Sequence, residues 1–177
     1  MTFVVDGTNG LTFNDATTQS STAANASNIS SGTLGKARLP TGSVLQVVSS
    51  VVHTAQQSTT STSFVSTGFS ASITPTSATS KILVTATGAI TALTANQSVA
   101  TTIARGSTVL DSTGLAYYEN SISSGYVWVP ATMIYLDSPA TTSSTSYTVY
   151  FKVISSGSGY FGNATAGVTF TLMEISA

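Results

Sequence analysis

The strongest constraint on this chain is a regular change of composition that begins at Ser43. From there, short runs rich in Val, Ile, Thr, Tyr and Phe alternate with clusters of Ser, Thr, Gly and Pro, and no helical period competes with them. Such runs predict strands, and the clusters between them predict turns. The pattern therefore predicts an all-β fold, an antiparallel β-sandwich of jelly-roll-like form. The expected strands cover residues 43–54, 62–74, 81–93, 97–105, 126–136, 146–154 and 167–175.

Alternation within two of these runs predicts which side chains enter the core. In a strand, successive side chains point to opposite faces of the sheet, so apolar residues two apart share one face. The residues expected to face the core are Ile82, Val84, Ala86, Val149, Phe151 and Val153. Lys81, Tyr150 and Lys152 are expected to face outward.

The chain carries too few charges to bind partners by electrostatics. Only 6% of its residues are charged, with five Lys and Arg against six Asp and Glu, and 62 of its 177 residues are Ser or Thr. Nucleic acid is therefore not an expected partner, since it requires a basic surface. We expect no membrane insertion either, because no apolar run reaches about 18 residues and no cleavable signal opens the chain. Synthesis in the cytoplasm is expected.

Residues 1–42 differ from the rest of the chain, because they show no sustained alternation and too few apolar side chains to close a core of their own. We expect them to be extended when alone and to be ordered by packing against other copies around a shared axis. The sequence thus divides into an N-terminal attachment and trimerisation segment, 1–42, and a β-sandwich knob, 43–177. The apolar residues expected to serve trimerisation or attachment are Phe3, Val5, Leu11, Phe13, Ile29, Leu34 and Leu39.

Several stretches of the chain are similar to segments that occur in the same order in one group of proteins. They are "GLTFNDATTQSSTA" (10–23), "NISSGTLGKARLPTGSVLQVVSS" (28–50), "SITPTSATSKILVTATG" (72–88), "IYLDSPATTSSTSYTVYFKV" (134–153) and "TLMEIS". Together they resemble bacteriophage tail-fibre and other virion appendage proteins of phages of aquatic bacteria. In the first stretch, Ala16 follows Asp15 at a position where these proteins usually have Gly; Ala tolerates the positive φ of a tight turn poorly.

The resemblance implies a structural virion protein, a tail or head fibre released by lysis. It implies a homotrimer whose N-terminal part attaches to other virion structural proteins and whose distal knob contacts a host cell-surface glycan or protein. A capsid decoration protein that binds no receptor is the alternative in a different class. A polysaccharide-degrading tail enzyme is a third.

Catalytic groups are scarce, and we expect no enzyme. His53 has no Gly-x-Ser-x-Gly nucleophile motif to serve, and a histidine on the surface or at an interface is expected. Asp111 and Glu119 are the one acidic pair that could meet in a loop for glycoside hydrolysis, which needs two carboxylates. No cofactor or metal site is expected within one chain, since it has one His and no Cys. The alternative is an ion bound on a trimer axis by three copies of His53 or of an Asp.

Two stretches have the composition of binding loops. Residues 114–128 combine aromatic, amide and carboxylate side chains, the groups that bind sugars and also anchor protein interfaces. Residues 156–167 place aromatics on a glycine-rich frame. The receptor-binding candidates are Tyr117, Tyr118, Asn120, Tyr160, Phe161 and Asn163. Trp128, which alternates with Tyr126, is expected to lie in the core or at a subunit interface.

Overall fold

The computed structural model describes residues 4–6, 10–12, 18–19, 35, 38–53, 55–121, 125–163, 165 and 167–177. The chain divides into two compact units, Met1–Leu39 and Pro40–Ala177. The described residues form strands and no α-helix, so the all-β prediction is confirmed. No helix long and apolar enough to cross a membrane occurs in the described part of the chain.

The first unit contains a small antiparallel sheet that the sequence did not predict. Its strands are β1 (Val4–Asp6), β2 (Gly10–Thr12) and β3 (Thr18–Gln19), in the order β1-β2-β3. Val5 pairs with Leu11, and Leu11 with Gln19. These two trimerisation candidates are thus neighbours in one sheet. Leu39 is half-buried, and Phe3, Phe13, Ile29 and Leu34 lie outside the described residues. Trimerisation by this set stays a prediction.

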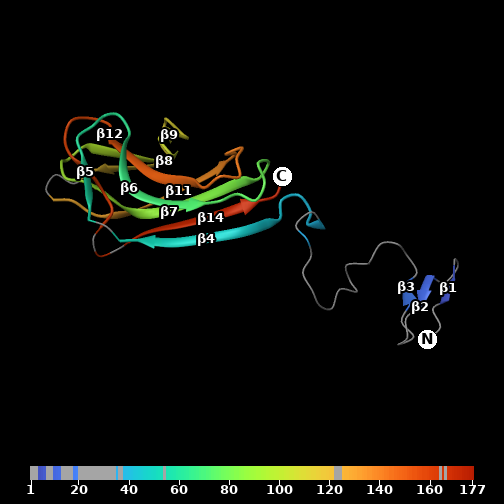
Figure 1. Cartoon of the computed structure of the whole chain (residues 1–177). Helices are drawn as coiled ribbons and strands as arrows, with labels where there is room; N and C mark the ends of the chain where they lie inside the picture. The colour runs from blue at the N-terminus through green and yellow to red at the C-terminus, as the bar shows by residue number, and fades with distance from the viewer. Residues whose placement is uncertain are drawn as a thin grey trace. The chain divides into compact units, whose positions relative to one another are not determined.

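One sheet of the second unit is built around the long strand β7 (Lys81–Ala92). β14 (Val168–Ile175) lies along one edge of β7 with β4 (Val44–Val52) outside it, and β11 (Val129–Asp137) lies along the other edge. Beyond the start of β14, β13 (Gly159–Phe161) pairs with the end of β7, and β5 (Gln57–Thr59) pairs with β13. Figure 1 shows β4, β14 and β7 running side by side.

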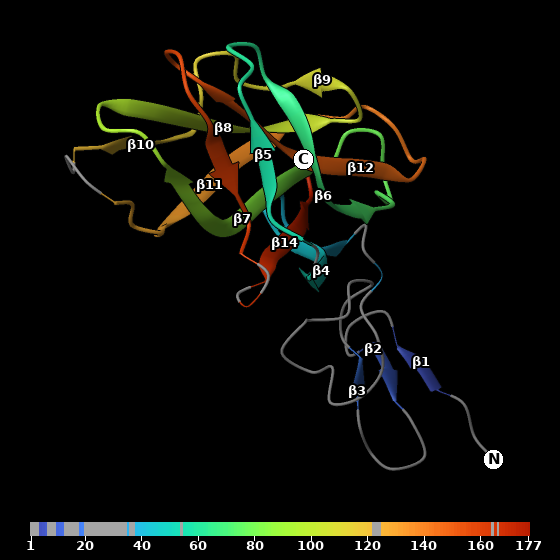
Figure 2. The ribbon, with the colours of Figure 1, turned by 90° about the vertical axis from the view of Figure 1, so that its left-hand side faces the viewer.

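The other sheet contains β10 (Ala116–Asn120), β8 (Gln97–Arg105), β12 (Thr145–Val153) and β6 (Val65–Ile73), in that order. The two-residue strand β9 (Thr108–Val109) pairs with the last residues of β8. All pairings are antiparallel. Figure 2 shows this sheet and the β7 sheet from one end of the unit. Two antiparallel sheets that share one core are compatible with the predicted β-sandwich.

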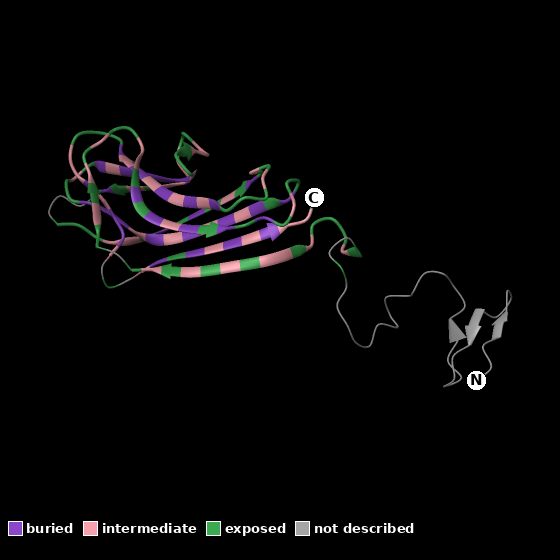
Figure 3. Cartoon of the chain, viewed as in Figure 1, coloured by how far each residue is buried: buried purple, intermediate pink, exposed green. Residues whose placement is uncertain are grey.

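The core lies between the sheets and is formed by the alternating side chains of both. Burial alternates along β7 and β12, as the sequence predicted (Figure 3). The predicted inward residues Ile82, Val84, Ala86, Val149, Phe151 and Val153 are at most 1% exposed. Lys81 is exposed, and Tyr150 and Lys152 are half-buried on the outer side. Both predicted alternation patterns are therefore confirmed.

The two ends of the sandwich differ, and we call them the base and the tip. At the base, the chain enters through residues 40–43 and β14 ends: Gly42 N donates to Ser176 O (2.9 Å), and Ser176 N donates to Ser43 O (2.9 Å). The second unit begins at Pro40, shortly before the predicted boundary at residue 43. The tip carries the connections that follow β4, β7, β10 and β12. The chain thus enters the second unit at the base.

A buried carboxylate, Glu174, fastens the base. It is fully buried, and its oxygens accept hydrogen bonds from Gln46 Nε2 (2.6 Å), Thr76 N (2.7 Å) and Thr76 Oγ1 (2.7 Å). Burial alone would raise the pKa of Glu174, but the hydroxyl of Ser80, together with Thr76 and Gln46, outweighs it and lowers the pKa from 4.5 to about 2. The carboxylate therefore stays ionised in mild acid.

A carboxylate with a lowered pKa makes stability depend on pH. The stabilisation is complete above the ordinary pKa of 4.5 and is lost as the pH falls toward 2. We expect the free energy of unfolding to drop by about 3 kcal/mol across that window, at 1.36 kcal/mol for each pKa unit. Urea titrations at pH 7, 4, 3 and 2 measure it. Glu174→Gln should flatten this acid dependence, whereas Glu119→Gln, at an exposed position, should leave it steep.

Candidate binding site

The outer surface of the β10–β8–β12 sheet has an open hollow of about 560 Å³ near the tip. It is lined by Ser98, Tyr117, Tyr118, Glu119 and Ile154. The hollow combines an aromatic ring, an aliphatic side chain, a hydroxyl and a carboxylate. Ligand sites are typically concave, mostly apolar and provided with a few polar groups that fix orientation. This is the candidate binding site.

Strand pairing places these side chains together. Glu119 lies directly opposite Ser98, and Tyr117 opposite Ala100, so Tyr117 and Glu119 share the outer face. Ile154 N donates to Ser98 O (2.9 Å) and brings the Ile154 side chain to the same hollow. Tyr117 is 59% exposed, whereas Tyr118 is half-buried and packs against the core. Tyr117 and Glu119 are therefore the groups most open to a ligand.

The ring of Tyr117 lies close to Gly114 in the turn before β10. Asp111 Oδ1 accepts hydrogen bonds from Thr113 N (2.8 Å), Thr113 Oγ1 and Gly114 N (3.3 Å), and the Thr113 hydroxyl is the main reason that the pKa of Asp111 lies below its usual range. Gly114 has φ +108°, and a Cβ there would lie 2.9 Å from the Tyr117 hydroxyl oxygen. Only glycine fits this position, both by conformation and by space.

The two acidic residues considered for hydrolysis have different surroundings. Glu119 lines the hollow, whereas Asp111 does not line it and is engaged with the backbone and hydroxyl of its own turn. The described residues contain no group of three or more His, Asp or Glu side chains placed to hold a metal ion. His53 is exposed on the surface, where a Cβ on Gly167 would lie 2.7 Å from its Cε1.

The structure corrects part of the first predicted binding loop. Tyr117 and Tyr118 lie on strand β10 rather than in a loop. Asn120 is fully buried, and its side-chain amide donates to Ala92 O (3.0 Å) and Gly125 O (3.2 Å). A buried amide that joins two tip connections holds them in place and does not meet a receptor. The sequence could not distinguish a buried structural amide from a receptor-binding amide, because the group offers the same donors and acceptor in both roles.

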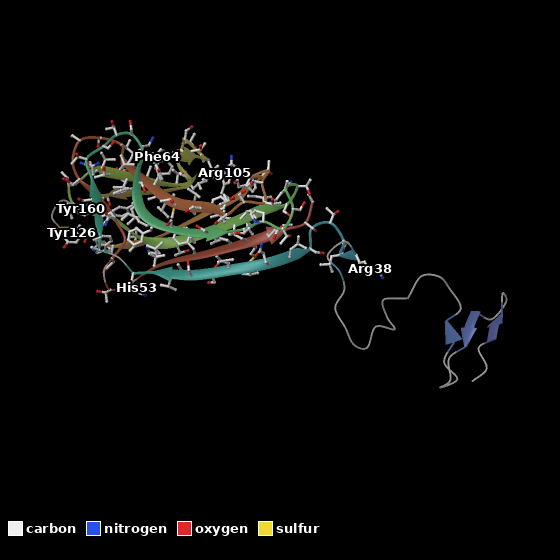
Figure 4. The ribbon with its side chains drawn as sticks, viewed as in Figure 1. Arg38, His53, Phe64, Arg105, Tyr126 and Tyr160 are labelled. Carbon is white, nitrogen blue, oxygen red and sulfur yellow. The ribbon has the colours of Figure 1, made fainter. Side chains whose placement is uncertain are left out.

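The second predicted loop is corrected in the same way. Tyr160 and Phe161 lie on β13, where Phe161 is fully buried in the core and Tyr160 is half-buried. Asn163 Oδ1 accepts from Thr165 N (2.9 Å) within its own turn. None of the three lines the hollow. Figure 4 shows Tyr160 and Tyr126 at the tip. Trp128, expected in the core or at an interface, is half-buried.

Sequence reasoning missed Ser98 and Ile154 as site residues. Both stand among alternating strand residues, with no local signal of binding. They could be found only by knowing that β10 pairs with β8 and that β12 flanks β8 on the other side. The hollow is thus a product of sheet topology, and of the whole set only Tyr117 and Tyr118 were predicted as receptor contacts. A comparison of the chain with models of known protein families finds no match, and a search of curated proteins likewise finds no relative.

Proposed function

We propose that this protein is a structural fibre of a phage virion, a tail or head fibre, whose β-sandwich binds a glycan of the host surface. The observation that carries the proposal is the hollow at Tyr117, Glu119 and Ser98, which lies near the tip and away from the base. Residues 1–42 would attach the fibre to the particle and join three copies. The resemblance to virion appendage proteins supports this assignment.

The strand order supports a jelly-roll form of the sandwich. β5 lies in line with β4, β13 with β14, and β9 with β10, so each of these pairs occupies one strand position. Each sheet then has four positions. They are β4/β5, β14/β13, β7 and β11 in one sheet, and β10/β9, β8, β12 and β6 in the other. When the eight positions are numbered 1 to 8 along the chain, they run 1-8-3-6 in one sheet and 5-4-7-2 in the other, which is the order of two Greek keys. Jelly rolls of this kind occur in viral capsid and lectin domains. This is an analogy of fold, and the functional argument rests on the hollow.

The chemistry of the hollow suits a sugar. A tyrosine ring offers a flat apolar face with a polar tip, to which the apolar side of a sugar ring can pack. The Glu119 carboxylate accepts hydrogen bonds from sugar hydroxyls, and the Ser98 hydroxyl both donates and accepts. A single open hollow binds weakly. Several copies on one particle would raise the overall affinity through avidity.

Tyr117→Ala is expected to weaken glycan binding at least tenfold, because it removes the only strongly exposed aromatic ring of the hollow. The measurement is binding of the full-length protein to a printed glycan array, followed by titration against the best ligand. Tyr126→Ala is the matched control, since Tyr126 is similarly exposed (55%) but does not line the hollow. Equal losses in both variants, or none in either, would contradict the assignment.

The same variants separate the other function classes. A decoration protein would show no ligand on the array and unchanged adsorption of particles with Tyr117→Ala, while removal of residues 1–42 would lower particle stability. A polysaccharide hydrolase would release reducing ends from the polymer, and Glu119→Gln would stop that release. Binding without release of reducing ends is the result expected for the fibre.

A further inference from the structure

The outer face of the β4–β14–β7–β11 sheet has an unusual composition for a surface. Strand register identifies the side chains that point away from the core. We call these residues the apolar face: Val44, Val47, Ser49, Val51, Lys81, Leu83, Thr85, Thr87, Thr132, Ile134, Leu136, Thr169, Thr171, Met173 and Ile175. They form cross-strand rows, one of which joins Val47, Met173, Leu83 and Leu136.

Charge is nearly missing from the apolar face. Of its 15 residues, eight are aliphatic or Met, six are Ser or Thr, and Lys81 alone is charged. An antiparallel sheet whose outer side faces water normally carries polar residues there. Here Val47, Ile134 and Leu136 are 54%, 59% and 50% exposed. The other sheet, by contrast, presents Lys152 and Glu119 outward, and Lys152 Nζ lies 4.4 Å from the ring centroid of Phe64.

The edge of the apolar face is also unprotected. β4 is an outer strand of nine residues, "VLQVVSSVV", and contains no charge and no Pro. Its residues alternate between exposed and half-buried, and none is fully buried (Figure 3). Proteins normally protect an exposed edge strand of this length with a Lys, with a Pro, or with a β-bulge within the strand rather than at its end. A covering partner would make such protection unnecessary.

We propose that copies of this chain associate through the apolar face of their sandwiches. A face with almost no charge can pack against its own copy without like-charge repulsion. Four strands about 4.8 Å apart and eight residues long cover about 500 Å². Two such faces bury about 1,000 Å², the area at which specific interfaces begin. The hollow lies on the other sheet, so association leaves it open.

The test uses the absence of cysteine in this chain, which makes an introduced thiol unique. Leu136→Cys places a thiol on the apolar face, and Ser72→Cys places one at an exposed position of the β6 edge on the other sheet. In the full-length chain, both are treated with a water-soluble maleimide at micromolar protein concentration. We expect the thiol at position 136 to react at least tenfold more slowly than the thiol at position 72.

The mass of the full-length protein in solution, by light scattering, completes the test. We expect a multiple of 18.0 kDa for the full-length chain, and in chains without residues 1–39, where that segment cannot hold the copies together, a mass that falls with Leu136→Lys and is unchanged by Ser72→Lys. Equal thiol reaction rates would overturn the proposal whatever the mass, because the face would then be open to water. A slow thiol at position 136 in a monomer would overturn it too, since the chain's own N-terminal unit would be the cover. Loss of glycan binding plays no part in either outcome, so the test is independent of the proposed function.

Discussion

Replacing Phe161 with alanine is expected to lower the free energy of unfolding by about 3–5 kcal/mol, the usual range for removing a buried phenylalanine. Phe161 is fully buried and meets Phe69 edge to face, with ring centroids 5.8 Å apart and an interplanar angle of 72°. Gly88 leaves room for the ring, since a Cβ at Gly88 would lie 2.6 Å from Phe161 Cζ.

The neighbouring residue provides the matched control. Tyr160 precedes Phe161 on the same short strand but points to the other side, where it is half-buried. Tyr160→Ala is expected to cost about 1 kcal/mol, because less apolar surface is lost from the interior. Chemical denaturation with urea compares the two variants directly. Similar losses in both would mean that β13 does not direct Phe161 into the core, and Phe161 would again be a candidate for receptor contact.

Removing the carboxylate of Asp137 is expected to be comparably damaging. Asp137 accepts from Arg105 Nη1 at both oxygens (2.8 and 2.9 Å) and from the Tyr147 hydroxyl (2.7 Å), and its side chain is 7% exposed. Burial, and then the hydrogen bond to Asp137, raises the pKa of Tyr147 well above its usual range, so this hydroxyl stays a donor. Asp137→Ala leaves the Tyr147 hydroxyl without its acceptor and leaves Arg105 Nη1 only its longer hydrogen bond to Ser138 O (3.3 Å).

Breaking a buried pair by removing one partner typically costs 3–5 kcal/mol. The Arg105 side chain is 33% exposed and can turn to water, so we expect about 3 kcal/mol, at the lower end of that range. Tyr147→Phe removes only the hydroxyl from the same cluster and should cost about 1 kcal/mol. Thermal and urea denaturation at pH 7 measure both. A loss for Asp137→Ala no greater than that for Tyr147→Phe would show that the ion pair with Arg105 contributes nothing.

Long alternating runs made most of the sandwich predictable. All seven expected strands occur, because period-two burial along runs such as β7 and β12 leaves a signal over nine or more residues. The short strands β5, β9, β10 and β13 were not predicted, since two to five residues cannot show a period. Gly159, the first residue of β13, and Gly114, shortly before β10, also favour turns by local composition.

The candidate site was less predictable than the fold. Aromatic and amide residues in glycine-rich surroundings suggested surface contact, but Phe161 and Asn120 are buried, and only pairing with distant strands decides that. The outward character of the apolar face was likewise hidden. Val47 and Leu136 look like core residues in a strand pattern, and nothing local shows that their sheet face lacks a covering layer.

The position of β14 between β4 and β7 has a consequence for synthesis. β4 is the first strand of its sheet to be made, yet it pairs with β14, and the Gln46–Glu174 bond joins residues 128 positions apart. On the ribosome, β4 and β7 must therefore wait for residue 175 before their sheet can close. Contacts this distant in sequence make folding slow, and unpaired strand edges invite aggregation meanwhile. The edges of β4 and β7 that pair with β14 therefore stay unpaired until the last strand has been made.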